Sequence, residues 1–226
     1  MYYRSCKFRK ITIGFEVTYF MKNFSDEYST LNQPAAAQIK VKGSRFIGNA
    51  FPAQTRDEAE ALILEWSKKY YDATHNCFAY RIGLGSDIVQ RYSDAGEPAG
   101  TAGLPIYQAI EGKDLSDIVV IITRYFGGTK LGKGGLVRAY RDATLAVLDV
   151  AEIRKKFLRA YYKINFPYEV TGEVMHLLET CGAEVTDSIY EQSVRLKVRI
   201  RLSLAPQLLK KLAEIQYKKV FVEDGV

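Results

Sequence analysis

Residues 118–141 read Ile-Val-Val-Ile-Ile-Thr-Arg-Tyr-Phe-Gly-Gly-Thr-Lys-Leu-Gly-Lys-Gly-Gly-Leu-Val-Arg-Ala-Tyr-Arg. The apolar run at 118–122 predicts a buried β-strand, and the glycines after it predict a loop. Apolar residues then recur at helical spacing, so a helix follows the loop. The predicted buried face of this helix carries Leu136, Val137, Tyr140, Ala143, Val147 and Leu148.

The same stretch contains five glycines and five cations, with no acid before Asp142. Glycine admits positive φ and lets backbone N–H groups approach an anion closely. The N-terminal end of the following helix adds partial positive charge at the same place. We therefore predict a phosphate or polyanion site, and the plainer alternative is a tight turn with solvated cations. The predicted residues are Arg124, Gly127, Gly128, Lys130, Gly132, Lys133, Gly134, Gly135 and Arg138.

The spacing of Gly127, Gly132 and Lys133 comes close to that of a nucleotide-binding P-loop. A P-loop continues with Ser or Thr, whose hydroxyl holds magnesium, whereas this chain has Gly134. The sequence therefore argues against a triphosphatase, and we expect no cofactor.

The chain has 226 residues, 47% of them hydrophobic, which is enough for one large or two small domains, and we favour two. It contains no run of about 18 uncharged apolar residues, so we expect no membrane span. Three widely spaced cysteines argue against a disulfide framework and for a reduced, cytoplasmic chain.

The net charge of +6 is unevenly distributed. Residues 21–151 hold fifteen cations and fifteen acids, so the cation cluster in their loop is local. Residues 1–20 do not resemble a secretory signal. Their alternating apolar residues fit an appended strand, whereas Met21 would suit a natural start, and both interpretations stay open. We treat residues 1–30 as an N-terminal extension of uncertain order.

Residues 31–152 have the pattern of a mixed α/β domain. Thr55 and Glu58 form a capping box that predicts a helix to about residue 71. Strands are predicted at 40–51, 75–82, 88–92 and 118–124, and a short helix from Pro105.

A second candidate site consists of polar residues in this domain: His75, Asn76, Asp94 and Glu97. Carboxylates in a glycine-rich turn commonly cap N–H groups, and the functional alternatives are metal coordination or pairing with Arg124 or with a lysine across the site. His75 and Cys77 would share a strand face about 7 Å apart, which is far for a nucleophile and its base. We expect Cys77 in the core, hydrogen-bonding roles for His75 and Asn76, and no metal site.

From Arg159 onward the predicted order is strand, helix, strand, strand, helix, strand, which is ferredoxin-like. Residues 194–202 alternate between apolar and basic, so the basic side chains should lie on the open sheet face. No acid occupies the facing positions of the first strand, so we predict a continuous basic surface suited to RNA phosphates. The alternative is the solvated side of an amphipathic strand. The predicted residues are Lys163, Arg195, Lys197, Arg199 and Arg201.

Several motifs together resemble the bacterial YigZ branch of the Impact family. They are Lys42-Gly-Ser-Arg-Phe46, His75-Asn-Cys77 with Ala79-Tyr-Arg81, Asp94-Ala-Gly-Glu-Pro98 with Gly100-Thr-Ala-Gly103, and Thr123-Arg-Tyr-Phe-Gly-Gly128 with Leu131-Gly132 and Gly134-Gly-Leu136. The resemblance covers about residues 40–150 with specific motifs and 155–222 more loosely.

This resemblance implies an α+β protein of two domains. Residues 31–152 would form an Impact N-terminal domain, with the left-handed βαβ fold shared by GHMP kinases and the second domain of a small-subunit ribosomal protein. Residues 153–226 would form a ferredoxin-like domain similar to domain V of elongation factor G. Eukaryotic members regulate translation through a partner of an initiation-factor kinase, but they do so with a further domain that this sequence lacks, so that partner is not carried over.

Two functional hypotheses follow. The favoured one is a non-enzymatic, translation-associated regulatory protein that binds ribosomal or other RNA, or a ribosome-associated protein, through the loop and the basic sheet face. It involves no membrane and no evident DNA specificity. The alternative is an enzyme or binder that acts on a phosphorylated small molecule at the glycine-rich loop, and the choice between an enzyme and a non-enzyme stays open.

Overall fold

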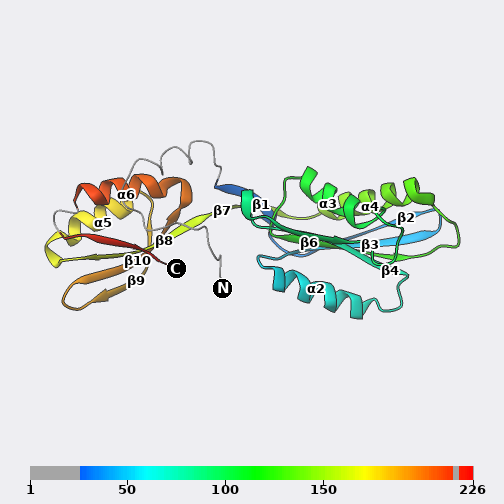
Figure 1. Cartoon of the computed structure of the whole chain (residues 1–226), viewed down its shortest axis with the longest axis horizontal. Helices are drawn as coiled ribbons and strands as arrows, with labels where there is room; N and C mark the ends of the chain where they lie inside the picture. Colours follow the sequence, from blue (N-terminus) through cyan, green and yellow to red (C-terminus); the bar gives the residue numbers. More distant parts are fainter. Residues whose placement is uncertain (1–25, 216–218, 226) are drawn as a thin grey trace. The chain divides into compact units, whose positions relative to one another are not determined.

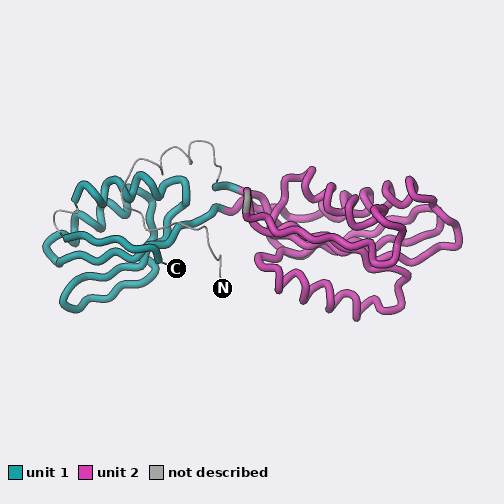
Figure 2. The backbone as a smooth tube through the Cα atoms, in the orientation of Figure 1, with its two compact units in different colours: residues 1–27, 157–226 teal, residues 28–156 magenta. Residues whose placement is uncertain are grey.

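The computed structural model describes residues 26–215 and 219–225, and these residues form two compact units. Figure 2 colours them separately: one is Tyr28–Lys156, and the other runs from Phe157 onward and includes Asp26 and Glu27. The alternating segment within residues 1–20 lies outside the described residues. The prediction of a two-domain α+β protein is confirmed.

The unit Tyr28–Lys156 is built on a five-stranded sheet in the order β2-β3-β6-β4-β5, in which neighbouring strands are antiparallel. Figure 1 shows helix α2 on one face of this sheet and helices α3 and α4 on the other. The elements are β2 (Ala35–Val41), β3 (Ser44–Pro52), α2 (Arg56–Lys69), β4 (His75–Ile82), the short 3-10 helix η1 (Gly85–Asp87), β5 (Val89–Ser93), α3 (Gly103–Gly112), β6 (Ile118–Tyr125) and α4 (Gly132–Asp149).

Strand β6 lies at the centre of this sheet and is buried from Ile118 to Arg124. Because helices cover both faces, its sequence is a continuous apolar run and does not alternate. Ile118, Val120 and Ile122 pack toward α3 and α4, while Val119 and Ile121 pack toward α2. The run predicted from residues 118–124 is therefore the core of the domain.

Helix α2 begins as the capping box predicts. The Oγ1 atom of Thr55 accepts a hydrogen bond from the Glu58 N–H at 3.2 Å, and the Glu58 carboxylate accepts one from the Gln54 N–H at 2.7 Å. In helix α4, the predicted apolar face is buried except at Val137, which is 36% exposed. That part of the prediction is wrong, because Val137 lies beside the buried stripe of Leu136 and Tyr140 and not within it.

A small two-stranded sheet pairs β1 (Glu27–Leu31) with β7 (Ile153–Phe157). Residues 27–30 thus lie in a strand, although the sequence analysis assigned them to an N-terminal extension of uncertain order. Two of their side chains donate hydrogen bonds to Asp117: the Tyr28 hydroxyl to the carboxylate at 2.6 Å and the Thr30 hydroxyl to the carbonyl oxygen at 3.1 Å. These bonds fix β1 on the sheet domain.

The C-terminal unit has a four-stranded antiparallel sheet in the order β11-β8-β10-β9, with helices α5 and α6 on one face (Figure 1). The strand order and the βαββαβ sequence of elements are ferredoxin-like, as predicted. The elements are β8 (Arg159–Phe166), η2 (Tyr168–Val170), α5 (Thr171–Thr180), β9 (Glu184–Tyr190), β10 (Val194–Arg201), η3 (Leu202–Leu204), α6 (Ala205–Glu214) and β11 (Phe221–Asp224).

The core of this unit comes from alternate residues of β8 and β10, packed against both helices. In β10, Val194, Leu196, Val198 and Ile200 are all buried. No helix in the described part of the chain is both long and apolar enough to cross a membrane.

Candidate functional site

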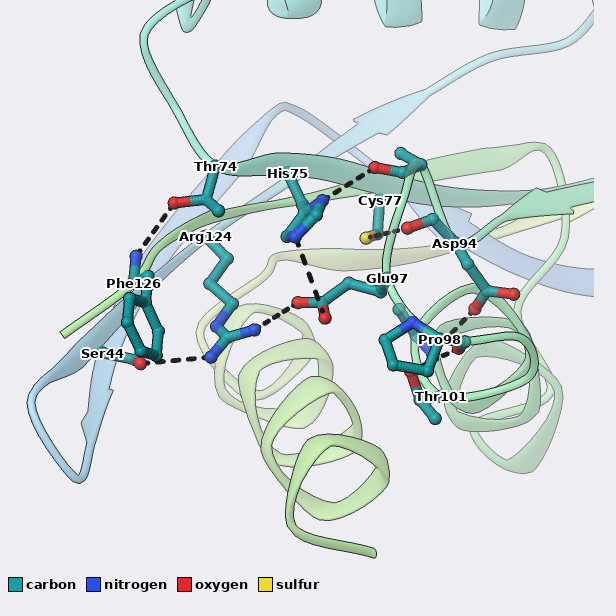
Figure 3. A network of polar contacts seen from close by, with 12 residues as sticks. Ser44, Thr74, His75, Cys77, Asp94, Glu97, Pro98, Thr101, Arg124 and Phe126 are labelled. Atoms are coloured by element: carbon teal, nitrogen blue, oxygen red, sulfur yellow. Dashed lines mark hydrogen bonds and ion pairs between the residues drawn. The ribbon is translucent and has the colours of Figure 1, made fainter. Parts of the chain in front are cut away.

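A buried ion pair lies where β6 ends. The Arg124 Nη1 atom donates to Glu97 Oε1 at 2.5 Å, and the two side chains are only 6% and 3% exposed. The second guanidinium nitrogen, Nη2, donates to the Ser44 hydroxyl at 3.3 Å. Figure 3 shows Arg124 between Ser44 on one side and Glu97 on the other. Of the three roles that the sequence analysis left open for Glu97, which are capping, metal coordination and pairing with a cation, the pair with Arg124 is the one observed.

This geometry changes the role of Arg124. The sequence placed its guanidinium in the anion site, but the structure buries it and engages it with Glu97 and Ser44. The physical reason is that a buried charge needs a partner of opposite sign and further hydrogen bonds. Arg124 therefore organises the end of the sheet and is not an exposed contact.

Tyr140 of α4 completes the pair and was missed as a site residue. Its hydroxyl donates to Glu97 Oε1 at 2.8 Å, and its ring packs edge-on against Phe46, with 5.2 Å between the ring centroids. The pKa of Tyr140 is raised, mainly by burial and further by the neighbouring Cys77 and Glu97. The phenol therefore stays protonated. In the sequence, Tyr140 is recognisable only as a member of the apolar face of the predicted helix, and that position does not indicate a polar role.

Cys77 and His75 follow each other on one face of β4, as expected. The Cys77 thiol is fully buried and donates to the carbonyl oxygen of Asp94 at 2.9 Å. Burial raises the pKa of Cys77 to about 12, so the sulfur is a thiol and not a nucleophilic thiolate. His75 Nδ1 lies 2.9 Å from the Ala95 carbonyl oxygen, which requires Nδ1 to carry the proton. Nε2 lies 3.9 Å from the Glu97 carboxylate.

Asn76 faces the opposite side of β4 and ties the strand to its neighbours. Its side-chain oxygen accepts from the Thr123 hydroxyl at 2.7 Å, and its amide nitrogen donates to the Tyr70 carbonyl oxygen at 3.0 Å. His75 and Asn76 thus both form hydrogen bonds, as expected, but Asn76 lies on the other side of β4 from His75 and is not part of the same group of polar side chains.

Asp94 caps helix α3. Its carboxylate accepts hydrogen bonds from the backbone N–H groups of Gly100, Ala102 and Gly103, each at 2.9 Å. Burial alone would raise the pKa of Asp94, but these N–H donors outweigh it and lower the pKa below its ordinary value of 3.8. Capping is therefore the observed role of Asp94 among those the sequence left open.

Replacing Asp94 by alanine is expected to destabilise the sheet domain by about 1–2 kcal/mol, because the N–H groups of Ala102 and Gly103 at the start of α3, and that of Gly100 in the preceding loop, lose their acceptor. Asp94→Asn keeps one acceptor oxygen and should cost less. Because the native pKa is lowered, the stabilisation is present above pH 3.8 and is lost as the pH falls through the native pKa. Urea unfolding at pH 7 and in acid measures both effects, and an equal loss in the two variants would contradict the cap.

The glycines of the predicted loop occupy different structural settings. Gly127 packs against backbone: a Cβ atom there would lie 1.9 Å from the Gly43 carbonyl carbon. Gly128 and Gly132 have positive φ angles of 85° and 70°. Gly134 and Gly135 lie inside the first turn of α4, so they are not loop residues. The loop proper is therefore short, because α4 begins at Gly132.

Of the four cations predicted for the anion site, Lys130, Lys133 and Arg138 stay exposed. Within residues 26–215 and 219–225, none of the three has an ion-pair partner. Helix α4 also has no side-chain N-cap, so its first turn adds partial positive charge beside them. The positive charge at this place is uncompensated.

The basic face of the C-terminal sheet is different. Arg195, Lys197, Arg199 and Arg201 do lie on the open face of β10, but each is paired with an acid. Their partners are Glu191, Asp187, Glu184 and Asp26, respectively, and Glu184 also pairs with Arg159. The predicted continuous basic surface is therefore wrong, because the edge strand β9 places Asp187 and Glu184 beside the ladder. Lys163 of β8 stays exposed on this face.

No group of three His, Cys, Asp or Glu side chains that could hold a metal ion occurs in the described ranges. The polar network around Glu97 is thus an arrangement of one buried ion pair, a phenol, a thiol and an imidazole. Chemically it can position the loop and α4, and the exposed cations beside it can meet an anion.

Comparison with known proteins agrees with this architecture. Residues 42–148 match the Impact N-terminal domain, and residues 164–215 match a domain of unknown function, DUF1949. The chain is 30% identical over 199 residues to the IMPACT family member YvyE of Bacillus subtilis (strain 168), covering 88% of this chain and 91% of that protein. It is 31% identical over 182 residues to the IMPACT family member YigZ of Escherichia coli (strain K12), covering 80% and 89%.

A solved structure described as a hypothetical protein aligns with 90% of this chain and 99% of its own, with a TM-score of 0.66 and 27% identity. Fold and domain matches together define a two-domain protein with an Impact N-terminal domain and a ferredoxin-like C-terminal domain. The chain belongs to the IMPACT family, which confirms the resemblance seen in its motifs.

Proposed function

We propose that this chain is a translation-associated regulatory protein of the cytoplasm that binds RNA, on the ribosome or elsewhere, through Lys130, Lys133 and Arg138. Family membership supports the link to translation, because the family's eukaryotic members regulate it. The observation that carries RNA binding is the uncompensated charge of these three exposed cations, in a region, residues 21–151, whose fifteen cations and fifteen acids balance overall. Phosphate-backbone contact requires such charge and no base readout.

The paired cations of β10 are weaker candidates for the same role. To meet a phosphate, each would have to give up an acid that lies within 3 Å of it. Lys163 is the residue of that face through which a second contact would be made. We therefore assign the main contact to the loop and α4, and leave the sheet face as a second surface to be tested separately.

The test is salt-dependent binding to ribosomes and to RNA. In Lys133→Ala or Arg138→Ala, the slope of log affinity against log salt should fall by roughly 0.7–0.9 for each phosphate that the variant no longer neutralises. The triple variant Lys130→Glu, Lys133→Glu, Arg138→Glu should not co-sediment with ribosomes at physiological salt.

Arg195→Ala is the matched control, because its cation is already paired with Glu191. Lys163→Glu tests the sheet face. Unchanged sedimentation of the triple variant would contradict the proposal, and loss only with ribosomes and not with RNA would indicate a ribosome-bound protein.

A phosphorylated small molecule at the same loop is the second candidate. It is favoured by the first turn of α4, which has no side-chain cap to occupy its N–H groups. A thermal-shift screen with nucleotides and phosphorylated metabolites, with and without magnesium, separates the candidates. Stabilisation by one compound that disappears in Lys133→Ala would favour the small molecule over RNA.

A further inference from the structure

Phe126 is a large aromatic residue that stays 47% exposed at the start of the cationic loop. Its position is tightly fixed. Its backbone N–H donates to the Thr74 hydroxyl at 3.0 Å, and the next residue, Gly127, packs against the backbone of Gly43. These two contacts fix the backbone that carries the ring at the end of β6.

The inner side of the ring is occupied by Arg124, whose guanidinium carbon lies 5.6 Å from the ring centroid. Figure 3 shows the Arg124 guanidinium between the Phe126 ring and the Glu97 carboxylate. Glu97 is bonded to Tyr140 of α4, so the guanidinium that contacts both Glu97 and the ring lies on the α4 side of the sheet. It therefore belongs to the same side of the domain as the helix that carries Lys133 and Arg138.

The backbone that joins the ring to the cations is open around two of its glycines. Nothing lies within 4 Å of the place where a Cβ atom would stand at Gly128 or at Gly132. A ligand can therefore approach the backbone at these two glycines without meeting another group within 4 Å of either position. An exposed aromatic residue in the same segment as unpaired cations is a combination that binds single-stranded nucleic acids, with bases stacked on the ring and phosphates on the cations.

We propose that Phe126 is a base-stacking residue for single-stranded RNA, with Lys130, Lys133 and Arg138 binding the phosphates of the same strand. The proposal rests on the RNA-binding function above and names the form of RNA. Double-stranded RNA keeps its base faces stacked inside the helix, so it would use the cations without the ring.

The experiment measures fluorescence anisotropy of the full chain with a labelled 12-nucleotide oligouridylate and with a duplex RNA of the same length. We expect Phe126→Ala to weaken binding of the single strand roughly 5- to 150-fold, the range for loss of one stacked base. Its salt slope should stay unchanged, because no cation is lost, and duplex binding should be unaffected. Phe126→Tyr should restore binding, which separates stacking from a loss of fold. Tyr168→Ala is the control, since Tyr168 is 48% exposed but lies in the C-terminal unit.

The outcomes distinguish the two proposals. If Lys133→Ala lowers the salt slope while Phe126→Ala binds the single strand like the wild type, RNA binding stands and the stacking role is overturned. If the duplex binds as tightly as the single strand and Phe126→Ala weakens both equally, the ring serves the fold and the stacking role is again overturned. If neither RNA binds, both proposals fall.

Discussion

Replacing Arg124 by methionine is expected to lower the free energy of unfolding of the sheet domain by about 3–5 kcal/mol. The substitution leaves the Glu97 carboxylate buried with the Tyr140 hydroxyl and without its cation. It also removes the donor to Ser44, whose hydroxyl in turn accepts from the Gly127 N–H. The loss therefore extends from the ion pair to the loop. Urea unfolding followed by fluorescence of Trp66, the single tryptophan, reports on this domain.

The double variant with Glu97→Gln shows whether the pair itself is responsible. Once both charges are gone, the buried carboxylate no longer lacks a partner. The double variant should therefore be more stable than the sum of the two single losses predicts, by at least about 1 kcal/mol. Lys113→Met provides the control: its ion pair with Asp149 is similarly short, at 2.7 Å, but exposed, and its loss should cost less than about 1 kcal/mol. Additive losses at Arg124 and Glu97 would show that the two charges do not stabilise each other.

The element order of both domains could be predicted from the sequence because each signal is local. A capping box at Thr55, an apolar run at 118–122 and strict alternation at 194–202 each specify one element without reference to the rest of the chain. The pairing of β1 with β7 gave no such signal. Its strands are separated by more than a hundred residues, and β7 reads Ile-Arg-Lys-Lys-Phe, which is not typical of a core strand.

The candidate site was harder to predict, since its residues meet only in the fold. His75 and Arg124 are direct partners across β4 and β6, and Glu97 reaches them from the loop after β5. The sequence marked all three as polar residues in specific motifs, and it could name pairing as one role for Glu97. It could not show that Arg124 is buried, because a cation at the end of a strand looks the same whether it meets solvent or a carboxylate.

The basic ladder of β10 illustrates a limit of alternation as a signal. Alternation correctly assigned the four cations to the open face, but the charge of that face also depends on the register of the neighbouring strands. β9 pairs with β10 through an irregularity between Lys197 and Val198, and this register sets Glu184 opposite Arg199. A one-residue change in this register would move Glu184 and Asp187 to the other face of the sheet.

Gly127→Ala is expected to be the most damaging single substitution in the glycine-rich stretch. The new Cβ atom would lie 1.9 Å from the carbonyl carbon of Gly43, 2.1 Å from its oxygen and 2.2 Å from the Ser44 nitrogen. All three atoms are backbone, so no side chain can rotate away, and the turn between β2 and β3 must separate from the end of β6. We expect a loss of roughly 3–5 kcal/mol, at the upper end of overpacking effects.

Gly134→Ala is the matched control in the same stretch. Gly134 lies in the first turn of α4, and the nearest atom to its added Cβ, Arg138 Nη1, is 3.9 Å away. Because alanine favours the helix over glycine by about 1 kcal/mol, this variant should be as stable as the wild type or more so. Urea unfolding of both variants gives the comparison. If Gly127→Ala unfolds at the same urea concentration as Gly134→Ala, the close approach of Gly127 to Gly43 is not a constraint on the fold, and Gly127 would then have to be explained by a ligand.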